Sequence, residues 1–599
     1  MRRPLKNVAS AMRILFVFHK PSFVRYFESL IDKLGAQGHR VHIAVRPVSR
    51  RETTRRRKPG PELLRRIDER SYDLIDRLCA EHATITRGPA PVRQDRWSSL
   101  TVALRRSIDY LRYMSPVYAD APKLRARAAR HTPELFVRLT GPRALRAPAV
   151  VRALDRLLRR LDTAIPPSPR VDEFIRSQSP DLMLITPLMF EPWQADYIRC
   201  ARARGVRTGL CVASWDNLTN KGLIQTPPDR IYVWNDDQRR EAVELHGVPG
   251  QRVVATGAQC FDQWFEWAPS TTSEEFRRRL GFPSDGAMLL YVCSYSFIAP
   301  EEPEFVERWL TALRGHPDER LRHASVLIRP HPKSEVRWDE SPLGEWSGVQ
   351  IWPPAGALPT DEESKSSYFD SIFHSDAVVG INTSALIESA IVGRPVFTVL
   401  DPQFEDTQEG TLHFRYLLRD NGGPLTVAHD LAEHLAQLAA ALSDESPDAQ
   451  IERFVHRFVR PHGLETPALP VLVEAIGQQL AAPAPSPAPA RLRSALGGVV
   501  LRPLAALAQR GVFATAAKRP QTGWATSARR RLKPLRRRLR RTRRAGVQAA
   551  GRLRIAASDR VSGRNGHVGA DGRDRRAQLT GAGAARDGAA DDGRSRPGA

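Results

Sequence analysis

The sequence predicts an α/β protein with two Rossmann-like domains that face a cleft, followed by a disordered basic C-terminal tail. Three observations indicate this fold. Strand and helix patterns alternate in residues 12–45, the alternation returns from residue 171, and a second series begins near residue 288. Short apolar runs separated by helices are typical of parallel strands that are buried on both faces. The chain has 599 residues, which is enough for two such domains.

The first strand–helix–strand unit is MRILFVFHKPSFVRYFESLIDKLGAQGHRVHIAV, residues 12–45. Its apolar run 14–18 suits a buried strand, and RVHIAV suits the next one. Between them, large apolar residues recur at the spacing of a helix face: Phe23, Phe27, Leu30 and Leu34. This order is the opening of a doubly wound sheet.

We place the N-terminal Rossmann-like domain at residues 12–258, with an Arg-rich helical insert at about 50–165, and the C-terminal domain at 259–480. The helices of the insert carry apolar residues on one face. This pattern fits solvated helices packed on the sheet, and it also fits a surface for an acceptor or a membrane. AAPAPSPAPA, residues 481–490, is a Pro/Ala linker, and 481–599 as a whole is predicted to be linker and disordered tail.

The net charge of +25 belongs to the tail. Of the 91 Lys and Arg residues and 66 Asp and Glu residues, 27 and 6 lie in 491–599, a balance of +21 that leaves +4 for residues 1–490. A nearly neutral body argues against a globular nucleic-acid-binding domain, which carries its charge on a folded face. We expect the tail to bind an anionic membrane surface, and we favour this partner over nucleic acid.

The five cysteines are scattered and show no metal-ligand spacing, which fits a reducing compartment. No stretch approaches the roughly 20 apolar residues of a membrane span, and the first residues do not read as a signal peptide. We therefore expect a cytoplasmic protein that can rest on the inner face of the plasma membrane.

The segment VVGINTSALIESAIVGRPVFTVL, residues 378–400, predicts a phosphate site. A buried strand ends in Asn382, Thr383 and Ser384, and these residues open a helix. Free backbone N–H groups and the positive end of a helix favour an anion, and two hydroxyl groups add donors. Asn, Thr and Ser also cap helices for purely structural reasons, so both interpretations stay open.

Neighbouring residues favour the phosphate interpretation. Glu388 lies four residues into the same helix. LIRPHPK, residues 327–333, ends another predicted strand with Arg329, His331 and Lys333, a cationic cluster suited to a diphosphate. The ends of parallel strands meet at one edge of a sheet, where doubly wound folds bind ligands.

Three motifs, ATGAQCFD, IRPHPK and GINTSALIESAIVGRPV, resemble in order and spacing those of the two-domain GT-B glycosyltransferase superfamily. The nearest subgroups are the bacterial nucleotide-sugar 2-epimerases and the CDP-glycerol glycerophosphotransferase-like cell-envelope enzymes. The resemblance covers roughly residues 12–480. It implies a nucleotide-diphosphate donor that is bound in the cleft, mostly by the C-terminal half.

Carried over by motif, the resemblance implies that Arg329 and His331 meet the diphosphate, that Thr383 and Ser384 cradle phosphate, and that Glu388 contacts a donor hydroxyl. The loop EDTQEGTLHF, residues 405–414, follows a strand as a donor-sugar loop does in such folds. Its polar groups suit polyols, although a solvated turn is an equal alternative. We assign to the donor site, in addition, Lys333, Asn382, Asp406, Gln408, Glu409 and His413.

The N-terminal half supplies the polar segment SWDNLTNKG, residues 214–222. The glycerophosphotransferase-like enzymes have a His-Gly motif near this place, whereas this chain has Trp215 and Asp216. Asp216 is our first candidate for the general base, although an Asx turn explains it equally well, and His19 is the second. Four further residues are expected in the cleft: Ser214, Asn217, Lys221 and Ser294.

No group of residues has the spacing of a metal site, and we expect neither a metal nor a cofactor besides the nucleotide-activated donor. Three functions remain. The first is transfer of a sugar or polyol phosphate from a nucleotide-sugar or nucleotide-polyol donor to a cell-envelope glycan or lipid-linked acceptor. The second is epimerisation of a nucleotide sugar, and the third is non-enzymatic binding of a membrane or nucleic acid through the tail.

Overall fold

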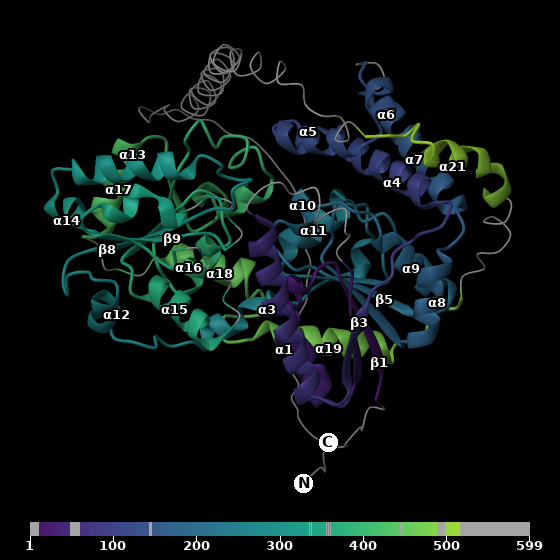
Figure 1. Ribbon diagram of the computed structural model, residues 1–599, viewed down its shortest axis with the longest axis horizontal. Helices are drawn as coiled ribbons and strands as arrows, with labels where there is room; N and C mark the ends of the chain where they lie inside the picture. The colour runs from purple at the N-terminus through teal and green to yellow at the C-terminus, as the bar shows by residue number, and fades with distance from the viewer. Residues whose placement is uncertain are drawn as a thin grey trace, which may run out of the picture. The chain divides into compact units, whose positions relative to one another are not determined.

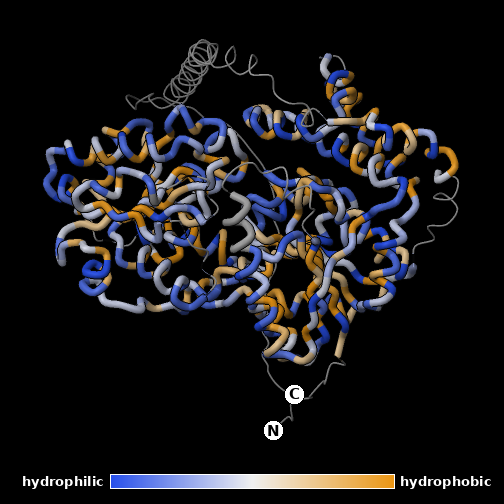
Figure 2. Tube along the Cα trace, viewed as in Figure 1, coloured by the Kyte–Doolittle hydropathy of each residue, from blue (hydrophilic) through white to orange (hydrophobic). Residues whose placement is uncertain are grey.

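The computed structural model describes residues 11–47, 60–142, 146–332, 338–354, 361–443, 448–487 and 497–515, and the single residues 334, 336, 356, 359 and 446. Figure 1 shows the helices and strands, and Figure 2 shows apolar residues gathered in the interior, where the strands lie. The basic block 528–544 lies outside the described residues, and so does Lys333.

The first sheet has seven parallel strands in the order β3-β2-β1-β4-β5-β6-β7. This is the Rossmann order, in which the direction of strand succession reverses beside the first strand. The strands are β1 Arg13–Phe18, β2 Arg40–Val45, β3 Ile85–Pro89, β4 Leu182–Thr186, β5 Arg207–Cys211, β6 Arg230–Val233 and β7 Val253–Ala255.

Helices cover both faces of this sheet. In β1, Ile14, Phe16 and Phe18 pack toward one face, and Leu15 and Val17 pack toward the other. The uninterrupted apolar run in the sequence follows from this two-sided burial. The first face is covered by α1 (Glu28–Ala36), α3 (Gly60–Glu81) and α19 (Ala468–Ala481), and the second by α8 (Pro169–Gln178), α9 (Gln194–Ala203) and α11 (Asp236–Glu244).

The second sheet has six parallel strands in the equivalent order β10-β9-β8-β11-β12-β13. The strands are β8 Met288–Val292, β9 Ser325–Arg329, β10 Val349–Ile351, β11 Ala377–Gly380, β12 Val396–Val399 and β13 Leu425–Ala428. Two parallel sheets with Rossmann-type strand orders confirm the predicted α/β fold class with two Rossmann-like domains.

The second sheet is also enclosed on both faces (Figure 1). One face carries α13 (Glu302–Arg314), α14 (Glu319–Arg322) and α17 (Leu431–Ala441). The other carries α12 (Ser273–Arg279), α15 (Glu362–Phe373), α16 (Ala385–Ile391) and α18 (Ala449–Phe458). Short 3-10 helices occur at Pro21–Phe27 (η1), Pro116–Tyr118 (η2), Gly250–Arg252, Gln259–Phe265, Trp338–Glu340, Pro342–Glu345, His413–Leu417 and Arg419–Asn421.

The helical insert is shorter than the predicted 50–165. Residues of α3 and β3 belong to the first Rossmann-like unit, because β3 pairs with β2 in parallel. The insert itself consists of α4 (Ser98–Arg112), η2, α5 (Pro122–His131), α6 (Glu134–Leu139) and α7 (Pro148–Ala164).

Two predicted domain boundaries also differ from the structure. Helix α19 was expected to close the C-terminal domain, but Leu472 and Ile476 pack against the first sheet. Part of the predicted tail is folded: α21 (Arg502–Gln509) packs on α4 through Leu501, Ala505 and Ala508. Among the described residues, no helix is both long enough and apolar enough to cross a membrane.

His434 of α17 is a buried polar group in the second sheet's core. Its side chain is fully buried near Trp309 and Phe397, and neither ring nitrogen has a hydrogen-bond partner among the residues described. Burial lowers the pKa of His434 to about 4. Between pH 6.5 and 4 the unfolded chain therefore binds a proton that the folded chain does not, and the free energy of unfolding falls as the pH falls.

We expect His434→Leu to raise the free energy of unfolding by about 1–3 kcal/mol at pH 7, because it removes an unsatisfied buried polar group. The difference in the free energy of unfolding between His434→Leu and the parent chain should grow as the pH falls from 6.5 toward 4. Urea unfolding midpoints at several pH values measure this. The exposed His429 provides the control, since His429→Leu should leave the midpoint unchanged. A His434→Leu midpoint below that of the parent would contradict the interpretation.

Candidate functional site

The candidate site lies where the strand order of the second sheet reverses, between β8 and β11. The backbone N–H of Asn382, after β11, donates to the Ser294 hydroxyl, after β8, over 3.2 Å. Gly380 permits this approach, because a Cβ there would lie 3.0 Å from the carbonyl oxygen of Val292. This edge is the ligand-binding position of doubly wound sheets.

A small cavity of about 90 Å³ opens at this edge. It brings together five of the predicted donor residues from the ends of β9 and β11 and from α16. It also receives Arg25 from η1 of the first unit and Tyr368 from α15. The predicted residues in its wall are Arg329, His331, Thr383, Ser384 and Glu388.

Arg329 is a buried cation without an anionic partner among the described residues. Its side chain donates to the Ser367 carbonyl over 3.0 Å and to the Ser371 hydroxyl, and its guanidinium lies 5.0 Å from the centre of the Tyr368 ring. Burial lowers the pKa of Arg329 to about 10, so the group is still charged at neutral pH. A buried charge that only neutral groups solvate is costly, and an anion in the cavity would compensate for it.

Arg25 adds a second cation to the cavity. Its Nη2 donates to the Tyr26 hydroxyl over 2.7 Å, whereas its Nε is buried and has no hydrogen-bond partner in the part of the chain that the structure describes. Glu388 is the one carboxylate among the described residues that line the cavity, and it accepts a hydrogen bond from the Tyr368 hydroxyl. Burial raises the pKa of Glu388, although the charge of Arg25 opposes the shift. The cavity therefore carries net positive charge.

The three residues that open α16 differ in role. Thr383 and Ser384 line the cavity, and Ser384 is exposed and makes no capping hydrogen bond. The Asn382 side chain points elsewhere, because its amide donates to the carbonyl of Thr407 over 2.5 Å. Asn382 thus holds the following loop rather than lining the cavity.

The loop 405–414 does not line the cavity. The Gln408 amide donates to the carbonyls of Ile381 and Val399, so Gln408 attaches the loop to the sheet. Asp406 is exposed and Glu409 is half-buried, and neither belongs to the cavity wall. The predicted donor-sugar contacts of this loop are therefore not assembled around Arg329.

A second polar cluster lies after β5, at α10 (Asn217–Asn220). The Ser214 hydroxyl donates to Oδ1 of Asp216 over 2.7 Å, and Lys221 Nζ lies 2.9 Å from Oδ2. Burial opposes ionisation of Asp216, but the charges of Lys221 and His413 outweigh it and hold the pKa of Asp216 well below its usual range. A carboxylate stabilised in this way is a weak proton acceptor.

His413 belongs to this second cluster. It comes from the loop after β12, and its ring meets the Trp215 ring edge-on with centroids 4.7 Å apart. Its Nδ1 lies 3.4 Å from the Thr219 hydroxyl. Burial lowers the pKa of His413 to about 4 although Asp216 opposes the shift, so the imidazole is neutral at pH 7. Only the tertiary structure brings these segments together.

His19 and Asn217 make structural contacts. Trp193 Nε1 donates to Nδ1 of His19 over 3.2 Å, so the neutral imidazole carries its proton on Nε2. That tautomer has no free nitrogen to accept a proton, which weighs against His19 as the base. The Asn217 amide donates to the Leu188 carbonyl over 3.0 Å and fixes the start of α10.

Three residues of these clusters were absent from the sequence prediction. Arg25 follows the first strand and turn, a place where Rossmann folds bring loops to the sheet edge, so its position was a usable signal. Tyr368 lies in a helix without a motif. Arg127 of α5 donates to Asn220 and stacks 4.0 Å from the Phe190 ring centre, and its Arg-rich surroundings gave no reason to single it out.

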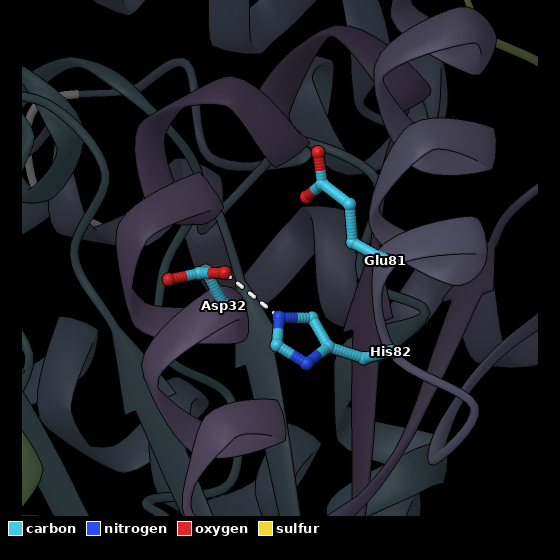
Figure 3. Close-up of side chains that lie close together, drawn as sticks. All are labelled: Asp32, Glu81 and His82. Carbon is cyan, nitrogen blue, oxygen red and sulfur yellow. Dashed lines mark hydrogen bonds and ion pairs between the residues drawn. The ribbon is translucent and has the colours of Figure 1, made fainter.

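One group among the described residues could hold a metal ion by proximity: Asp32, Glu81 and His82 (Figure 3). His82 Nε2 lies 2.8 Å from Asp32 Oδ1, and both carboxylates are exposed. The residues come from α1 and the end of α3, not from the strand ends that form the cavity. Exposed acidic groups of this kind are common without an ion, and we assign no metal to it.

No protein-family model matches the chain, and no curated protein matches its sequence. Solved structures with a similar arrangement include the UDP-GlcNAc 2-epimerase of Methanocaldococcus jannaschii (8% identity, 78% of this chain and 100% of that one, TM-score 0.43). They also include the Neisseria meningitidis UDP-GlcNAc 2-epimerase bound to UDP-GlcNAc (10% identity, 78% of this chain and 100% of that one, TM-score 0.42). A third is a Rickettsia africae glycosyltransferase (11% identity, 79% of this chain and 100% of that one, TM-score 0.43). The fold assignment itself rests on the two strand orders.

Replacing Arg329 should separate anion binding from stability. We expect Arg329→Met to weaken the binding of inorganic pyrophosphate about tenfold or more, the loss typical of a charge-assisted hydrogen bond. The urea midpoint should stay the same or rise, because the uncompensated buried charge is gone. Titration calorimetry and urea unfolding measure the two effects.

Arg277 is the matched control for this experiment. It is equally buried, and it donates to the backbone carbonyls of Asp285 and Gly286 away from the cavity. Arg277→Met should retain the parent affinity for pyrophosphate. Equal affinities in the parent and Arg329→Met would show that the cavity is not an anion site.

Proposed function

We propose that the protein is a glycosyltransferase-type enzyme that moves a sugar or polyol phosphate from a nucleotide-activated donor to a cell-envelope glycan or lipid-linked acceptor. The observation that carries the proposal is the buried guanidinium of Arg329 at the carboxyl edge of the second sheet, which has no anionic partner among the described residues and has Arg25 beside it. A diphosphate is the anion that such a pair and the nearby hydroxyl groups suit best.

In this reaction the cations act on the leaving group. When a sugar is transferred its C–O bond to the diphosphate breaks and a nucleoside diphosphate leaves, and when a polyol phosphate is transferred the P–O bond within the diphosphate breaks and a nucleoside monophosphate leaves. In both cases negative charge grows on the departing oxygen, and Arg329 and Arg25 stabilise that charge. Thr383 and Ser384 supply hydroxyl donors to the same anion. Glu388, held by Tyr368, orients a hydroxyl of the transferred group.

The acceptor side of the reaction belongs to the second cluster. The charge of Lys221 lowers the pKa of Asp216 and so makes this carboxylate a weak proton acceptor. We therefore assign the role of general base to His413 and not to Asp216. The neutral imidazole of His413 can take the proton of an acceptor hydroxyl, and the Asp216 carboxylate stabilises the imidazolium that forms. This division of work between His and Asp follows the logic of hydrolytic triads.

Nucleotide-sugar epimerisation is the alternative within the same fold. An epimerase needs acids and bases on the sugar itself, but the described wall of the cavity offers Glu388 as its one carboxylate. A non-enzymatic role is the third candidate, and the stability cost of Arg329 speaks against it, since a buried charge without a ligand brings the fold no benefit.

A single assay separates the three functions. The full chain is incubated with a panel of UDP- and CDP-activated sugars and polyols, with and without membrane extract. UDP is the first nucleotide to test, because several of the similar solved structures contain UDP or UDP-GlcNAc. Acceptor-dependent nucleotide release supports transfer, isomerisation without an acceptor supports the epimerase, and neither turnover nor binding supports the third role.

The base assignment predicts a specific mutant pattern. We expect His413→Gln to lower transfer about 100-fold while donor binding is retained, because the amide keeps a hydrogen bond to Thr219 but cannot accept a proton. Asp216→Asn should lower the rate of transfer less than His413→Gln does, since Asp216 acts through His413. Transfer kinetics and donor titration provide the two readouts. Full activity in His413→Gln together with none in Asp216→Asn would return the base to Asp216.

We propose also that the basic tail holds the protein at an anionic membrane. Residues 491–544 contain 17 Lys and Arg and no acid, and each basic group near an anionic leaflet contributes about 1 kcal/mol, less as salt rises. Because α21 packs on α4, the truncation that tests this must follow Thr515. The chain 1–515 should no longer sediment with phosphatidylserine vesicles at low salt, while pyrophosphate binding persists.

Equal sedimentation of the full and truncated chains would refute the membrane role. A matched experiment replaces the vesicles with duplex DNA at the same salt concentration. Tighter retention of the full chain on DNA than on vesicles would favour nucleic acid as the partner of the tail.

A further inference from the structure

A largely apolar cavity of about 700 Å³ lies outside the donor cavity, between the helical insert and the end of α11. Its walls come from α4, η2 and α7 and from residues 244–247. A volume of this size matches that of ligand sites for drug-sized molecules. Representative apolar residues of the wall are Leu111, Met114, Val151 and Leu245.

The wall of this cavity contains two unpartnered polar groups. The Arg112 side chain is only 5% exposed, and its Nη2 donates to the Tyr113 hydroxyl and to the Lys221 carbonyl. Among the described residues, Nε and Nη1 of Arg112 and the hydroxyl of Tyr118 are buried and have no hydrogen-bond partner. The carboxylate of Asp109 lies 3.2 Å from Nη2, which leaves two of the three guanidinium nitrogens without a hydrogen bond in this part of the chain.

Unsatisfied donors on a buried cation are costly, and an anionic oxygen would satisfy them. The rest of the wall has the same preference. It contains four further arginines and two carboxylates, Asp155, which pairs with Arg159 at 2.8 Å, and the exposed Glu244. The four are Arg146, Arg152, Arg156 and Arg159.

The surface around the cavity is unusually apolar for an Arg-rich region. Val117 of η2 and Leu157 of α7 are about half exposed, and so are several apolar residues of α6 and of the segment that contains α21. Apolar side chains interleaved with arginines suit a ligand that has both a hydrocarbon chain and an anionic group. A free phosphate would use the arginines but leave the apolar wall without a function.

We propose that this cavity binds an amphiphilic phosphate, that is, a lipid with one aliphatic or isoprenoid chain along the apolar wall and its phosphate at Arg112. The position of Arg112 also connects this ligand to the acceptor cluster. Arg112 holds the carbonyl of Lys221, whose ammonium pairs with Asp216. The phosphate end of the lipid therefore lies beside the acceptor cluster, and, resting on the proposed function for this step alone, the lipid anchors the acceptor, a group linked to its phosphate whose hydroxyl gives its proton to His413.

Direct binding tests the site without any assay of activity. The full chain is titrated with farnesyl phosphate, farnesol and inorganic phosphate by calorimetry. We expect binding of farnesyl phosphate and at least tenfold weaker binding of the other two. Arg112→Gln should weaken farnesyl phosphate about tenfold, the size of a lost charge-assisted hydrogen bond, and Arg112→Lys should weaken it less.

Arg112 is buried, so exposed residues provide a second test that does not endanger folding. Arg152→Glu and Arg156→Glu on α7 should each weaken farnesyl phosphate about three- to fivefold, as expected for charges at a rim. Arg160→Glu on the same helix is the matched control, because Arg160 is exposed and does not line the cavity. It should bind like the parent.

The proposal is overturned if farnesyl phosphate does not bind, if farnesol or inorganic phosphate binds equally well, or if the α7 variants and the control behave alike. Pyrophosphate titration of the same variants monitors the donor cavity. Lipid binding without donor binding would refute the proposed function and still support the lipid site. Donor binding without lipid binding would refute the lipid site and leave the proposed function supported.

Discussion

Parallel strand pairing is the constraint on which the rest of the structure depends. Each parallel strand must be followed by a crossover connection, so every strand of a sheet delivers its carboxyl end to the same edge. In the second sheet this places the residues after β8, β9 and β11 together, and the hydrogen bond from Asn382 to Ser294 closes the two central ends on each other. Residues more than fifty positions apart thereby line one cavity.

The site concentrates charge that the fold does not need. Arg329 is solvated by a carbonyl, a hydroxyl and an aromatic ring, and Arg25 leaves a nitrogen unpaired nearby. By contrast, Arg105 in the insert is equally buried but pairs with Asp162 and Asp196 at 2.9 and 3.0 Å. Arg329 therefore differs from Arg105 in having no carboxylate partner among the residues that the structure describes.

The fold and half of the candidate site could be predicted from the sequence, because they depend on local patterns. Apolar runs and helix spacing indicate the strands, and strand ends indicate Arg329, Thr383 and Glu388. The structural roles of Gln408 and Asn382 could not be predicted from local patterns. Their side-chain amides donate to backbone carbonyls that only the tertiary structure brings near, and these contacts keep them out of the cavity wall. Helix α21 was not predicted, because the composition of the segment around it is typical of a disordered tail.

The contacts of His413 and Arg25 explain why the two sheets form one functional unit. His413 belongs to a loop of the second sheet but packs on Trp215 of the first, whereas Arg25 follows the first strand of the first sheet but lines the cavity of the second. Each half thus completes the other's cluster. The halves also meet through polar contacts, such as Arg457 with Asp237 at 3.0 Å and Tyr416 with Glu241 at 2.6 Å. Their contact is apolar as well, because Trp215 and Trp234 of the first half belong to the same buried cluster as the core of the second sheet.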